Sequence, residues 1–398
     1  MRRAAVVSAL RTAVGAFGGA LRPLPADQLA AQAIRALMAR TGLDPAALDE
    51  VIVAQSYASS EAPCLGRYAA LAAGLPIELP GYSLDRRCGS GLQAVIDAAM
   101  LVQTGAADVV LVAGVESMSN IEYYTTDLRW GTRSGSVRMH DRLQRGRERS
   151  QPPERFGAIS GMPETVENLV REHGITRAAA DAFAARSHQR AARAWAEGRF
   201  ADEVVPVRVP QRKDEDLVVT TDEGIRAGST PESLAKLKPL LDGGTVTAGN
   251  ASQQNDAAAA CLVVAEERLA GLGLEPMAFL RGWAAAGCHP ATMGIGPVPA
   301  VAKLMARTGL TLERMDLVEL NEAFAGQVLA VLQGWKWRDD ERLNVNGGGI
   351  SLGHPIGATG AILIGTVLDE LERQDKQFGL VTMCAAGGMA PAIIIERI

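Results

Sequence analysis

The sequence predicts an α/β protein in which strands and helices alternate along the chain and pack in layers. Two short and almost continuous apolar runs, at residues 51–54 and 109–113, are typical of strands that are covered on both faces. Between them, apolar residues over 92–100 recur with the spacing of one helix face. Three further apolar runs continue the pattern, at 260–265, 317–320 and 380–384. Alternation of this kind predicts a layered α/β architecture.

Composition and charge exclude several classes of function. The 398 residues carry a net charge of −5, so a chain-wide basic surface for nucleic acid is not expected. No window of about 18 uncharged apolar residues occurs, and we expect no membrane span. The five cysteines are an odd number without a CxxC pair, which disfavours a disulfide scaffold and a structural zinc site. Free thiols fit a reducing compartment, and we expect a cytoplasmic protein.

Residues 121–244 differ from the sequence on either side of them. They contain fewer apolar runs, many charges and several prolines. We therefore predict an inserted loop domain at 121–244. It separates an N-terminal half, formed by 1–120 and 245–270, from a C-terminal half at 271–398. Each half has a glycine-rich turn before a helix of small residues, CGSG at 88–91 and HPIG at 354–357, which is a weak sign of an internal repeat.

Cys88 is the strongest candidate for a nucleophile. It lies in the run RRCGSGLQA (86–94), directly before the amphipathic segment. The positive end of a helix dipole and the two preceding arginines both favour the thiolate. The glycines permit a tight turn and the close approach of a ligand. An isolated cysteine at a helix end is more often a small buried residue, but this context favours a nucleophile.

Four other features have to be weighed together with Cys88. They are Asn321 after the run 317–320, His354 in the glycine-rich loop 346–355, Cys384 at the end of the run 380–384, and the turn 249–252 before an alanine-rich strand. Each has a structural interpretation when taken alone: a helix N-cap, a loop histidine, a core cysteine and a surface turn. Four such coincidences are much rarer together, which favours a shared site. The patterns GxxxxGK[ST] and GxGxxG do not occur, so phosphate-loop and dinucleotide sites have no support.

In this order and over nearly the whole chain, these motifs resemble the thiolase family of acetyl-CoA acetyltransferases and 3-ketoacyl-CoA thiolases. The matching segments are CGSGLQA at 88–94, TAGNAS at 247–252, NEAFA at 321–325, GHP with GATG at 353–360, and Cys384 in the place of the second catalytic cysteine. The resemblance implies reversible condensation of acetyl-CoA and thiolysis of 3-ketoacyl-CoA, as part of fatty acid metabolism. Acetyl-CoA C-acetyltransferase is the main interpretation.

The resemblance also implies a division of labour among the site residues. Cys88 would carry the acyl group as a thioester. His354 would activate Cys88 and, with a water positioned by Asn321, help to hold the thioester oxygen of the second substrate. Cys384 would remove the α-proton from that substrate. The backbone N–H groups of Cys88 and Ala386 would form an oxyanion hole, which suits the need of this chemistry for a thiolate, a base and a stabilised enolate.

The fold implied is thiolase-like, with two similar α/β halves in five layers, α-β-α-β-α, and the inserted loop domain over the active site. Acyl-CoA and free coenzyme A would be substrates, without a resident cofactor or a metal, and the protein would be a homodimer or homotetramer. Substrate contacts are expected at six residues: Arg226 near the adenine, Ala248 and Ser252 along the pantetheine, Met162 and Met293 in the acyl pocket, and Phe324. The arginine-rich stretch 129–155 is expected either to attract coenzyme A or to form a solvated loop or a subunit contact.

Three departures from the family pattern bear on acyl chain length and on coenzyme A packing. Ala386 stands where the family has glycine, with CAAGG in place of CxGGG. The run 162–168 reads MPETVEN rather than MGxTAEN, and Gln253 replaces the glycine of NASG. Ala386 keeps its N–H but lacks the torsional freedom of glycine, so the geometry of the oxyanion hole is open at this point.

Four alternatives have to be weighed against the main interpretation. A longer-chain degradative 3-ketoacyl-CoA thiolase shares every catalytic residue named. A condensing ketosynthase is less favoured, because it uses a second histidine where Asn321 stands. A catalytically silent CoA-binding scaffold would be indicated by the loss of a catalytic residue, and none is lost. A thiol redox sensor has no resolving cysteine next to Cys88 in the sequence.

Overall fold

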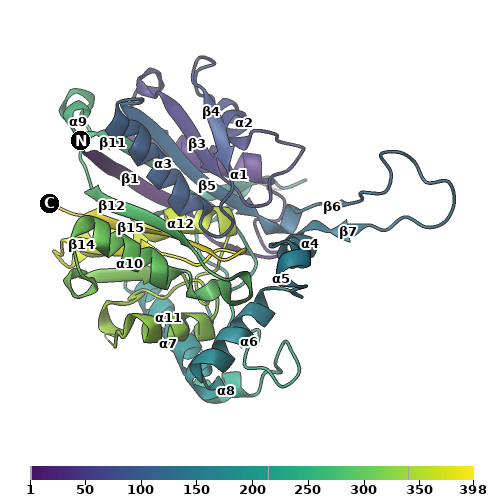
Figure 1. The fold of residues 1–398 in the computed structure, drawn as a ribbon. Coiled ribbons are helices and arrows are strands. Elements are labelled where there is room, and N and C mark those ends of the chain that lie inside the picture. The colour runs from purple at the N-terminus through teal and green to yellow at the C-terminus, as the bar shows by residue number, and fades with distance from the viewer. Residues whose placement is uncertain (1, 214, 339) are drawn as a thin grey trace.

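A long mixed sheet runs through the molecule in the computed structural model, which describes residues 2–213, 215–338 and 340–398 (Figure 1). Its strands are β1 (Ala4–Thr12), β2 (Gly15–Ala16), β3 (Glu50–Ala54), β4 (Gly81–Leu84), β5 (Val109–Ser117), β8 (Val204–Val205), β11 (Asn255–Ala265), β12 (Ala278–Gly287), β13 (Leu317–Leu320), β14 (Phe378–Thr382) and β15 (Met389–Glu396). The helices are α1 (Ala26–Thr41), α2 (Leu65–Ala72), α3 (Ser90–Thr104), α4 (Arg142–Glu148), α5 (Pro153–Phe156), α6 (Met162–His173), α7 (Arg177–Ala196), α8 (Pro231–Ala235), α9 (Glu266–Leu272), α10 (Pro297–Thr308), α11 (Ala325–Trp335) and α12 (Ile356–Arg373).

Strand β1 joins the two parts of this sheet. It pairs antiparallel with β11, from Ala4 opposite Ala265 onwards, and near its start it also pairs antiparallel with β12, where Ala5 lies opposite Phe279. On one side of β1 follow β11, β5, β3 and β4, and on the other side follow β12, β15, β14 and β13.

The two parts of the sheet repeat one strand order. In the N-terminal part, the five main strands lie side by side in the order β4-β3-β5-β11-β1. Numbered by their succession along the chain, these are the third, second, fourth, fifth and first strands. The C-terminal part has the order second, fourth, fifth, first (β13-β14-β15-β12), and Leu343 makes an isolated parallel bridge to Val318 in the place of the third strand. Helix α3 follows β4 and α12 follows Leu343. The two glycine-rich turns therefore occupy equivalent positions in the repeat.

Alternate side chains of the strands enter different hydrophobic cores, which explains the continuous apolar runs. In β5, Leu111 packs with α1 and α2, whereas Val110 packs in the core that contains α3 and α12. In β15, Ile395 belongs to that same central core, whereas Ile394 packs with α10 and α11. The result is a stack of five layers, α-β-α-β-α, as the resemblance implied.

The two central helices approach each other closely because glycines lie at their contact. A Cβ on Gly360 would lie 2.0 Å from the backbone nitrogen of Leu92, and a Cβ on Gly91 would lie 2.8 Å from the carbonyl oxygen of Gly357. A larger residue at either glycine would push backbone against backbone. This contact brings the N-termini of α3 and α12 together, and with them the two turns that precede the helices.

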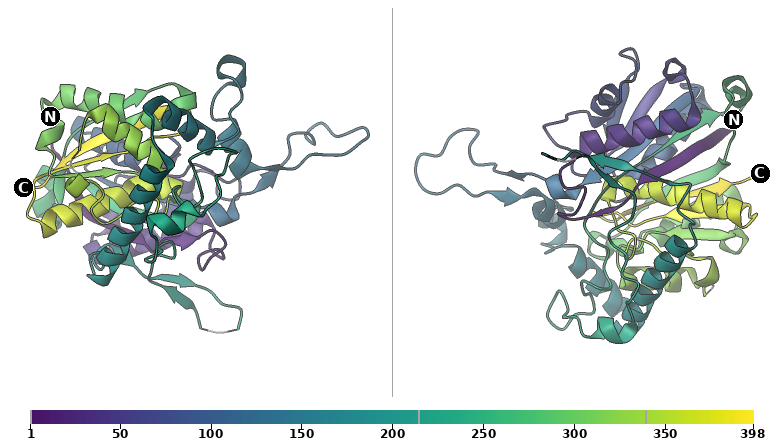
Figure 2. Two further views of the ribbon diagram at one scale, coloured as in Figure 1. Left: turned by 90° about the horizontal axis from the view of Figure 1, so that it is seen from below. Right: turned by 180° about the vertical axis from the view of Figure 1, so that it is seen from behind.

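Apart from β8, which pairs with β1 in the main sheet, the described residues of 121–244 form helices, two small hairpins and irregular loops. The loop between β6 (Tyr123–Tyr124) and β7 (His140–Asp141) projects far from the rest of the molecule (Figures 1 and 2). A second hairpin is formed by β9 (Val207–Val209) and β10 (Leu217–Val219). Helices α6 and α7 pack against α11. The boundaries of the three predicted segments stay a prediction.

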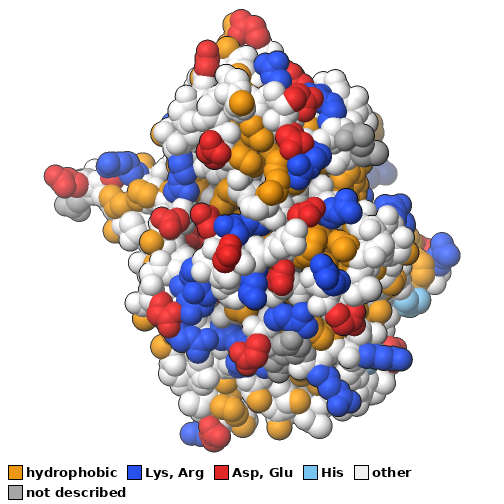
Figure 3. Space-filling model, turned by 90° about the vertical axis from the view of Figure 1, so that its left-hand side faces the viewer, with side chains coloured by type: hydrophobic (Ala, Val, Ile, Leu, Met, Phe, Trp, Pro, Cys, Tyr) orange, Lys and Arg blue, Asp and Glu red, His pale blue; other side chains and the backbone are white. Residues whose placement is uncertain are grey.

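The structure corrects the strand expected from the apolar run 380–384. The apolar run 380–384 does not form the last strand: β14 ends at Thr382, and β15 follows it along the chain. Strands β12 and β15 and helix α6 were not predicted. In the described part of the chain, no helix is long and apolar enough to cross a membrane. Acidic and basic side chains are interspersed on the face shown in Figure 3, in keeping with the small net charge.

Candidate active site

Cys88 lies in a tight turn in front of α3. Arg87 before it has φ of +52°, a left-handed conformation that is unusual for a residue with a side chain. The buried Ser90 holds the turn, because its Oγ accepts the N–H of Arg86 at 2.8 Å and donates to the carbonyl oxygen of Arg87 at 2.6 Å. These two hydrogen bonds hold Arg87 in its strained backbone conformation. Strained residues of this kind are common next to functional groups.

Burial raises the pKa of the Cys88 thiol. The backbone N–H of Ala386, the charge of Arg87, the N–H of Cys88 itself and the charge of Arg147 all act in the opposite direction. The sequence predicts that the helix terminus and the arginines favour the thiolate. These positive groups do lower the pKa of the Cys88 thiol, but burial raises it by more. The resting residue is therefore a thiol that needs a base.

His354 lies directly before α12 with its imidazole buried. Its Nδ1 is 2.7 Å from the hydroxyl of Thr359, and that hydroxyl also lies 3.1 Å from the carbonyl oxygen of Pro355. A carbonyl can only accept, so the hydroxyl donates to Pro355 and accepts the Nδ1–H of the imidazole. Nε2 then carries the lone pair, and it has no partner among the described residues. Burial and the charge of Arg147 lower the pKa of His354 to about 4, so the ring is neutral at neutral pH.

Asn321 offers a buried amide that no described residue contacts. The residue is only 1% exposed, and neither its Oδ1 nor its Nδ2 has a hydrogen-bond partner. Helix α11 begins at Ala325 with Phe324 as its N-cap, so the interpretation of Asn321 as a helix N-cap is wrong. Its backbone N–H donates to the carbonyl oxygen of Thr382 at 3.1 Å, which ties it to the segment before Cys384. An unpaired buried amide is costly, which favours a polar ligand or water at this place.

Cys384 stands between β14 and a tight turn into β15. Gly387 and Gly388 take φ of +87° and +83°, and the N–H of Ala385 donates to the carbonyl oxygen of Met389 at 2.7 Å to close the turn. Cys384 is fully buried, and this burial raises the pKa of its thiol well above the ordinary value. The charge of a Cys88 thiolate raises it further, so the two sulfur atoms lie within electrostatic range of each other.

Met162, Met293 and Phe324 belong to one apolar cluster with Cys384. Met293 and Phe324 are buried, and Met162 is half-buried at the start of α6. The structure therefore brings the expected acyl-pocket residues together beside the second thiol.

Two buried carboxylates, which the sequence reasoning missed, support the site. Glu116 accepts the N–H groups of Ser56, Tyr57 and Gly357 at 3.0, 3.2 and 2.9 Å, and its pKa is raised to about 7 by burial. Ser56 in turn donates to the carbonyl oxygen of Arg87 at 2.8 Å, so Glu116 connects the turn of Cys88 with the start of α12.

Glu322 is the second of these carboxylates. It accepts the hydroxyl of Ser187 at 2.6 Å and the amide of Asn344 at 3.0 Å, directly after Asn321 in the chain. Both residues could have been recognised in the sequence, because each is an acidic residue inside or just after an apolar strand. A carboxylate that is buried there needs hydrogen-bond donors.

Comparison with known proteins identifies the family. Residues 4–267 match the family described as thiolase, N-terminal domain, and residues 274–397 match thiolase, C-terminal domain. The chain belongs to the thiolase family.

The similarity to individual thiolases extends over whole chains. The chain is 44% identical to an acetyl-CoA acetyltransferase of Chromobacterium violaceum over 394 residues, which is 99% of both chains. It is 44% identical to that of Pseudomonas aeruginosa over 100% of both. The crystal structure of the Bacillus anthracis acetyl-CoA acetyltransferase superposes with a TM-score of 0.96 at 40% identity, covering 100% of this chain and 99% of the other. Human mitochondrial 3-ketoacyl-CoA thiolase in complex with CoA gives a TM-score of 0.93 at 37% identity, with 100% and 98% coverage. The predicted family and fold are confirmed.

The loop expected to bind coenzyme A in this thiolase is fixed beside the NEAFA segment. The N–H of Ser252 donates to the carbonyl oxygen of Ala323 at 2.9 Å, and Ala251 forms an isolated bridge with Phe324. Ala248 is exposed and Ser252 is half-buried, so both are open to a ligand. Arg226 is also exposed, and its N–H donates to Nδ1 of His188 at 3.2 Å.

The structure accommodates two of the departures from the family pattern. Ala386 does not take a positive φ, because Gly387 and Gly388 supply the left-handed conformations of the turn. The N–H of Ala386 still faces Cys88, as the expected oxyanion hole would require. Gln253 donates to the carbonyl oxygens of Gly224 at 2.9 Å and Ile350 at 3.0 Å. It thereby ties the coenzyme A loop to the segment of Arg226.

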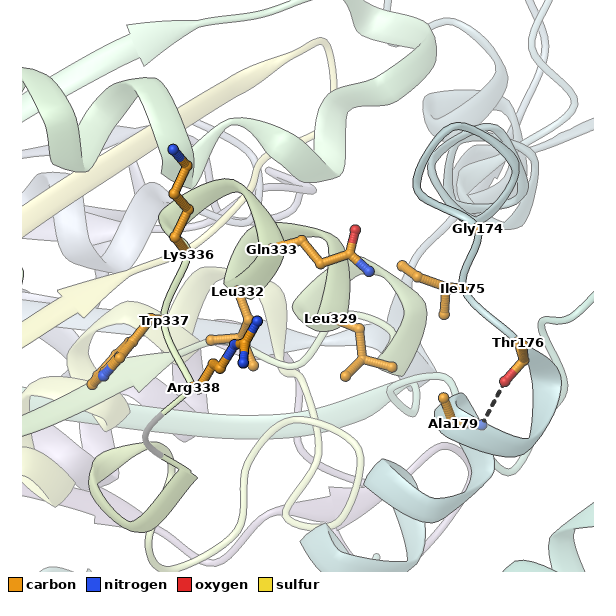
Figure 4. A pocket seen from close by; sticks show the side chains of 10 residues that line it. All are labelled: Gly174, Ile175, Thr176, Ala179, Leu329, Leu332, Gln333, Lys336, Trp337 and Arg338. Atoms are coloured by element: carbon orange, nitrogen blue, oxygen red, sulfur yellow. Dashed lines mark hydrogen bonds between the residues drawn. The ribbon is translucent and has the colours of Figure 1, made fainter.

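A cavity of about 670 Å³ is lined by other residues. It is bounded by Ile175, Thr176 and Ala179 on one side and by residues around the end of α11, including Gln333 and Trp337, on the other (Figure 4). None of the predicted catalytic residues lines it. The size of this cavity therefore does not locate the candidate active site. That site is located by the contact between the N-termini of α3 and α12.

Proposed function

We propose that this thiolase is an acetyl-CoA acetyltransferase, which condenses two acetyl-CoA molecules and cleaves 3-ketoacyl-CoA in the reverse direction. The observation that carries the proposal is the convergence of two thiols, the half-buried Cys88 and the buried Cys384, with an imidazole nitrogen of His354 that has no described partner. The full-length similarity to proteins named acetyl-CoA acetyltransferase supports the substrate.

In the first half-reaction, Cys88 takes up the acetyl group. Neutral His354 accepts the thiol proton at Nε2 as the sulfur attacks the thioester carbonyl of acetyl-CoA. The backbone N–H groups of Cys88 and Ala386 receive the negative charge on the carbonyl oxygen. The carbon–sulfur bond to coenzyme A then breaks. Coenzyme A leaves as a thiol with the proton from His354, and the acetyl group remains on Cys88.

In the second half-reaction, the thiol of Cys384 gives its proton to Nε2 of His354, and the resulting thiolate takes a methyl proton from a second acetyl-CoA. Protonated His354 and a water positioned by the amide of Asn321 hold the thioester oxygen while the enolate forms. The enolate carbon attacks the acetyl group on Cys88, a carbon–carbon bond forms, the bond to the Cys88 sulfur breaks, and the Cys88 thiolate takes the proton back from His354. The raised pKa of Cys384 makes its thiolate a strong base and, in thiolysis, makes its thiol the proton donor to the enolate.

Acyl-CoA and free coenzyme A are the proposed partners, without a resident cofactor. Ala248, Ser252 and Arg226 would hold coenzyme A, and Met162, Met293 and Phe324 would surround the acyl group. Ala248 and Arg226 are exposed and Ser252 is half-buried, so all three are accessible to a ligand. This accessibility and the packing of the last three residues beside Cys384 support the assignment.

We further propose a cytoplasmic homodimer or homotetramer that acts in fatty acid metabolism. The projecting loop between β6 and β7 supports a subunit contact, because it carries Trp130 with 95% of its surface exposed. Aromatic side chains are enriched at contact surfaces between proteins.

A longer-chain degradative thiolase is the second candidate. The apolar cluster of Met162, Met293 and Phe324 and the likeness to human mitochondrial 3-ketoacyl-CoA thiolase favour it. A steady-state panel of 3-ketoacyl-CoA chain lengths, run beside acetyl-CoA condensation, separates the two. An acetyl-CoA acetyltransferase cleaves acetoacetyl-CoA best and condenses acetyl-CoA. Turnover of none of these substrates, with coenzyme A still bound, would indicate a silent scaffold instead.

A further inference from the structure

The cavity of Figure 4 takes no part in the proposed reaction, because none of the expected catalytic or substrate-contact residues lines it. It lies between the link that joins α6 to α7 and the C-terminal end of α11. Its volume of about 670 Å³ is within the range of small-molecule sites, about 300–1,000 Å³. The cavity is therefore large enough for a ligand of its own.

The wall of this cavity is mostly apolar. Ile175 and Leu332 are buried, and Leu329 is half-buried. From α11, the side chains of Leu329 and Gln333 point toward the segment that contains Ile175 and Ala179 (Figure 4). A hydrocarbon chain placed against this wall would leave water, which raises affinity about fourfold for each buried methylene group.

The rim of the cavity is positively charged. Lys336 and Arg338 line it and are exposed, and none of the described lining residues is acidic. Neither cation forms an ion pair or a side-chain hydrogen bond with another described residue. By contrast, the guanidinium of Arg342 donates to the carbonyl oxygens of Glu313 at 3.1 Å and Met315 at 2.7 Å, and so has a structural role. The guanidinium of Arg338 is open to an anion.

The apolar wall and the charged rim together identify the class of ligand. An inorganic anion would gain nothing from the wall, and a neutral hydrocarbon would gain nothing from the rim. A planar guanidinium matches a carboxylate with two parallel hydrogen bonds. An aliphatic chain that ends in a carboxylate uses both parts of the cavity.

We propose that this cavity binds an aliphatic carboxylate of medium chain length, with the carboxylate at Arg338 and the chain against Ile175 and Leu329. The inference goes beyond the proposed function and does not depend on it. Ile175 and Leu329 also pack in the apolar cluster that contains Cys384. A test therefore has to distinguish this cavity from the expected acyl pocket on the same cluster.

The test measures the binding of octanoate to the wild type by calorimetry and by tryptophan fluorescence, since Trp337 lines the cavity. Octan-1-ol, which lacks the charge, should bind about 3- to 10-fold more weakly, the effect of a charge pair partly screened by water. Arg338→Gln should weaken octanoate binding by the same factor. Butanoate, which has a shorter chain, should bind at least about 10-fold more weakly.

Three controls locate the bound octanoate. Arg314→Gln and Lys376→Gln remove exposed cations that do not line the cavity, and they should leave its affinity unchanged. Ala179→Phe places a ring in the cavity from an exposed position, and it should abolish octanoate binding without loss of thiolase activity. Saturating acetyl-CoA should not displace octanoate from the wild type.

The inference is overturned if acetyl-CoA displaces octanoate, because the carboxylate then occupies the acyl pocket. Octanoate binding that persists in Ala179→Phe, or that Arg338→Gln leaves unchanged, overturns it as well. So does a wild type that does not bind octanoate; a changed oligomer size of Ala179→Phe would then show that another subunit covers the cavity. If octanoate binds as expected to a protein without thiolase activity, the proposed function fails and the inference stands.

Discussion

The hydroxyl of Thr359 lies 2.7 Å from Nδ1 of His354, and this contact decides which nitrogen of the ring can act as a base. Because the same hydroxyl lies 3.1 Å from the carbonyl oxygen of Pro355, it accepts from Nδ1–H and leaves Nε2 unprotonated. Thr359, on the first turn of α12, thus sets which ring nitrogen of His354 carries the proton.

Thr359→Val should keep the shape of the site but release the ring of His354. We expect kcat to fall by about 10- to 100-fold, the cost of a misoriented catalytic group. Thr359→Ser, which keeps the hydroxyl, should retain most of the activity and serves as the matched control. Equal activity of the two variants would mean that the ring is oriented by packing alone.

Cys384→Ser should separate the two half-reactions. Formation of the acyl-enzyme needs no carbon acid to be deprotonated, so Cys88 should still become acetylated. Condensation should slow by about 10²- to 10⁴-fold, the usual contribution of a general base. The same variant should lose the exchange of the acetyl-CoA methyl protons with deuterated water, measured by NMR. His354→Ala should instead impair both half-reactions. Normal exchange in Cys384→Ser would identify another base.

The pH dependence of Cys88 alkylation tests the resting protonation state. Burial raises the pKa of Cys88, and burial together with Arg147 lowers that of His354 to about 4. Above that pH the imidazole is neutral, so the resting pair is a thiol beside a neutral ring. The rate with iodoacetamide should therefore rise continuously from about pH 5 to about pH 9. A preformed thiolate–imidazolium pair would react at a constant rate already in acid, as low-pKa cysteines do, and such a plateau below about pH 6 would refute this assignment.

Substitutions in the turn after Cys384 should show why alanine is tolerated there. Ala386 does not need a positive φ, so Ala386→Gly should destabilise the fold by no more than about 1 kcal/mol, through the entropy of the unfolded chain. Gly387 has φ of +87°, and a Cβ would lie 3.0 Å from the carbonyl oxygen of Ser150. Gly387→Ala should cost about 1–3 kcal/mol. Urea unfolding of both variants measures the difference, and a larger loss in Ala386→Gly would contradict it.

The sequence predicted the parts of this thiolase that depend on local pattern and on motif order. Continuous apolar runs marked the central strands, and the two glycine-rich turns marked the helices whose N-termini meet. The strand expected at 380–384 was placed too far along the chain, because its apolar run continues past Thr382, where β14 ends, into a turn. An apolar run does not show where strand pairing stops.

Other parts of the site could not be predicted because they depend on contacts between distant segments. Glu116 has its role only because Ser56, Tyr57 and Gly357 bring three N–H groups to it. Likewise, an arginine-rich sequence does not show that the guanidinium of Arg87 donates to the carbonyl oxygen of Gly146 at 3.0 Å, which ties α4 to the turn of Cys88.

The most direct test of the account is to find where the acetyl group goes. Wild-type protein incubated with acetyl-CoA and digested with protease should show one added acetyl group by peptide mass spectrometry, on the peptide that contains Cys88. The label should disappear on addition of free coenzyme A and should be absent from Cys88→Ala, which should also be inactive. An acetyl group on another residue, or full activity of Cys88→Ala, would contradict the central claim that Cys88 carries the acyl group.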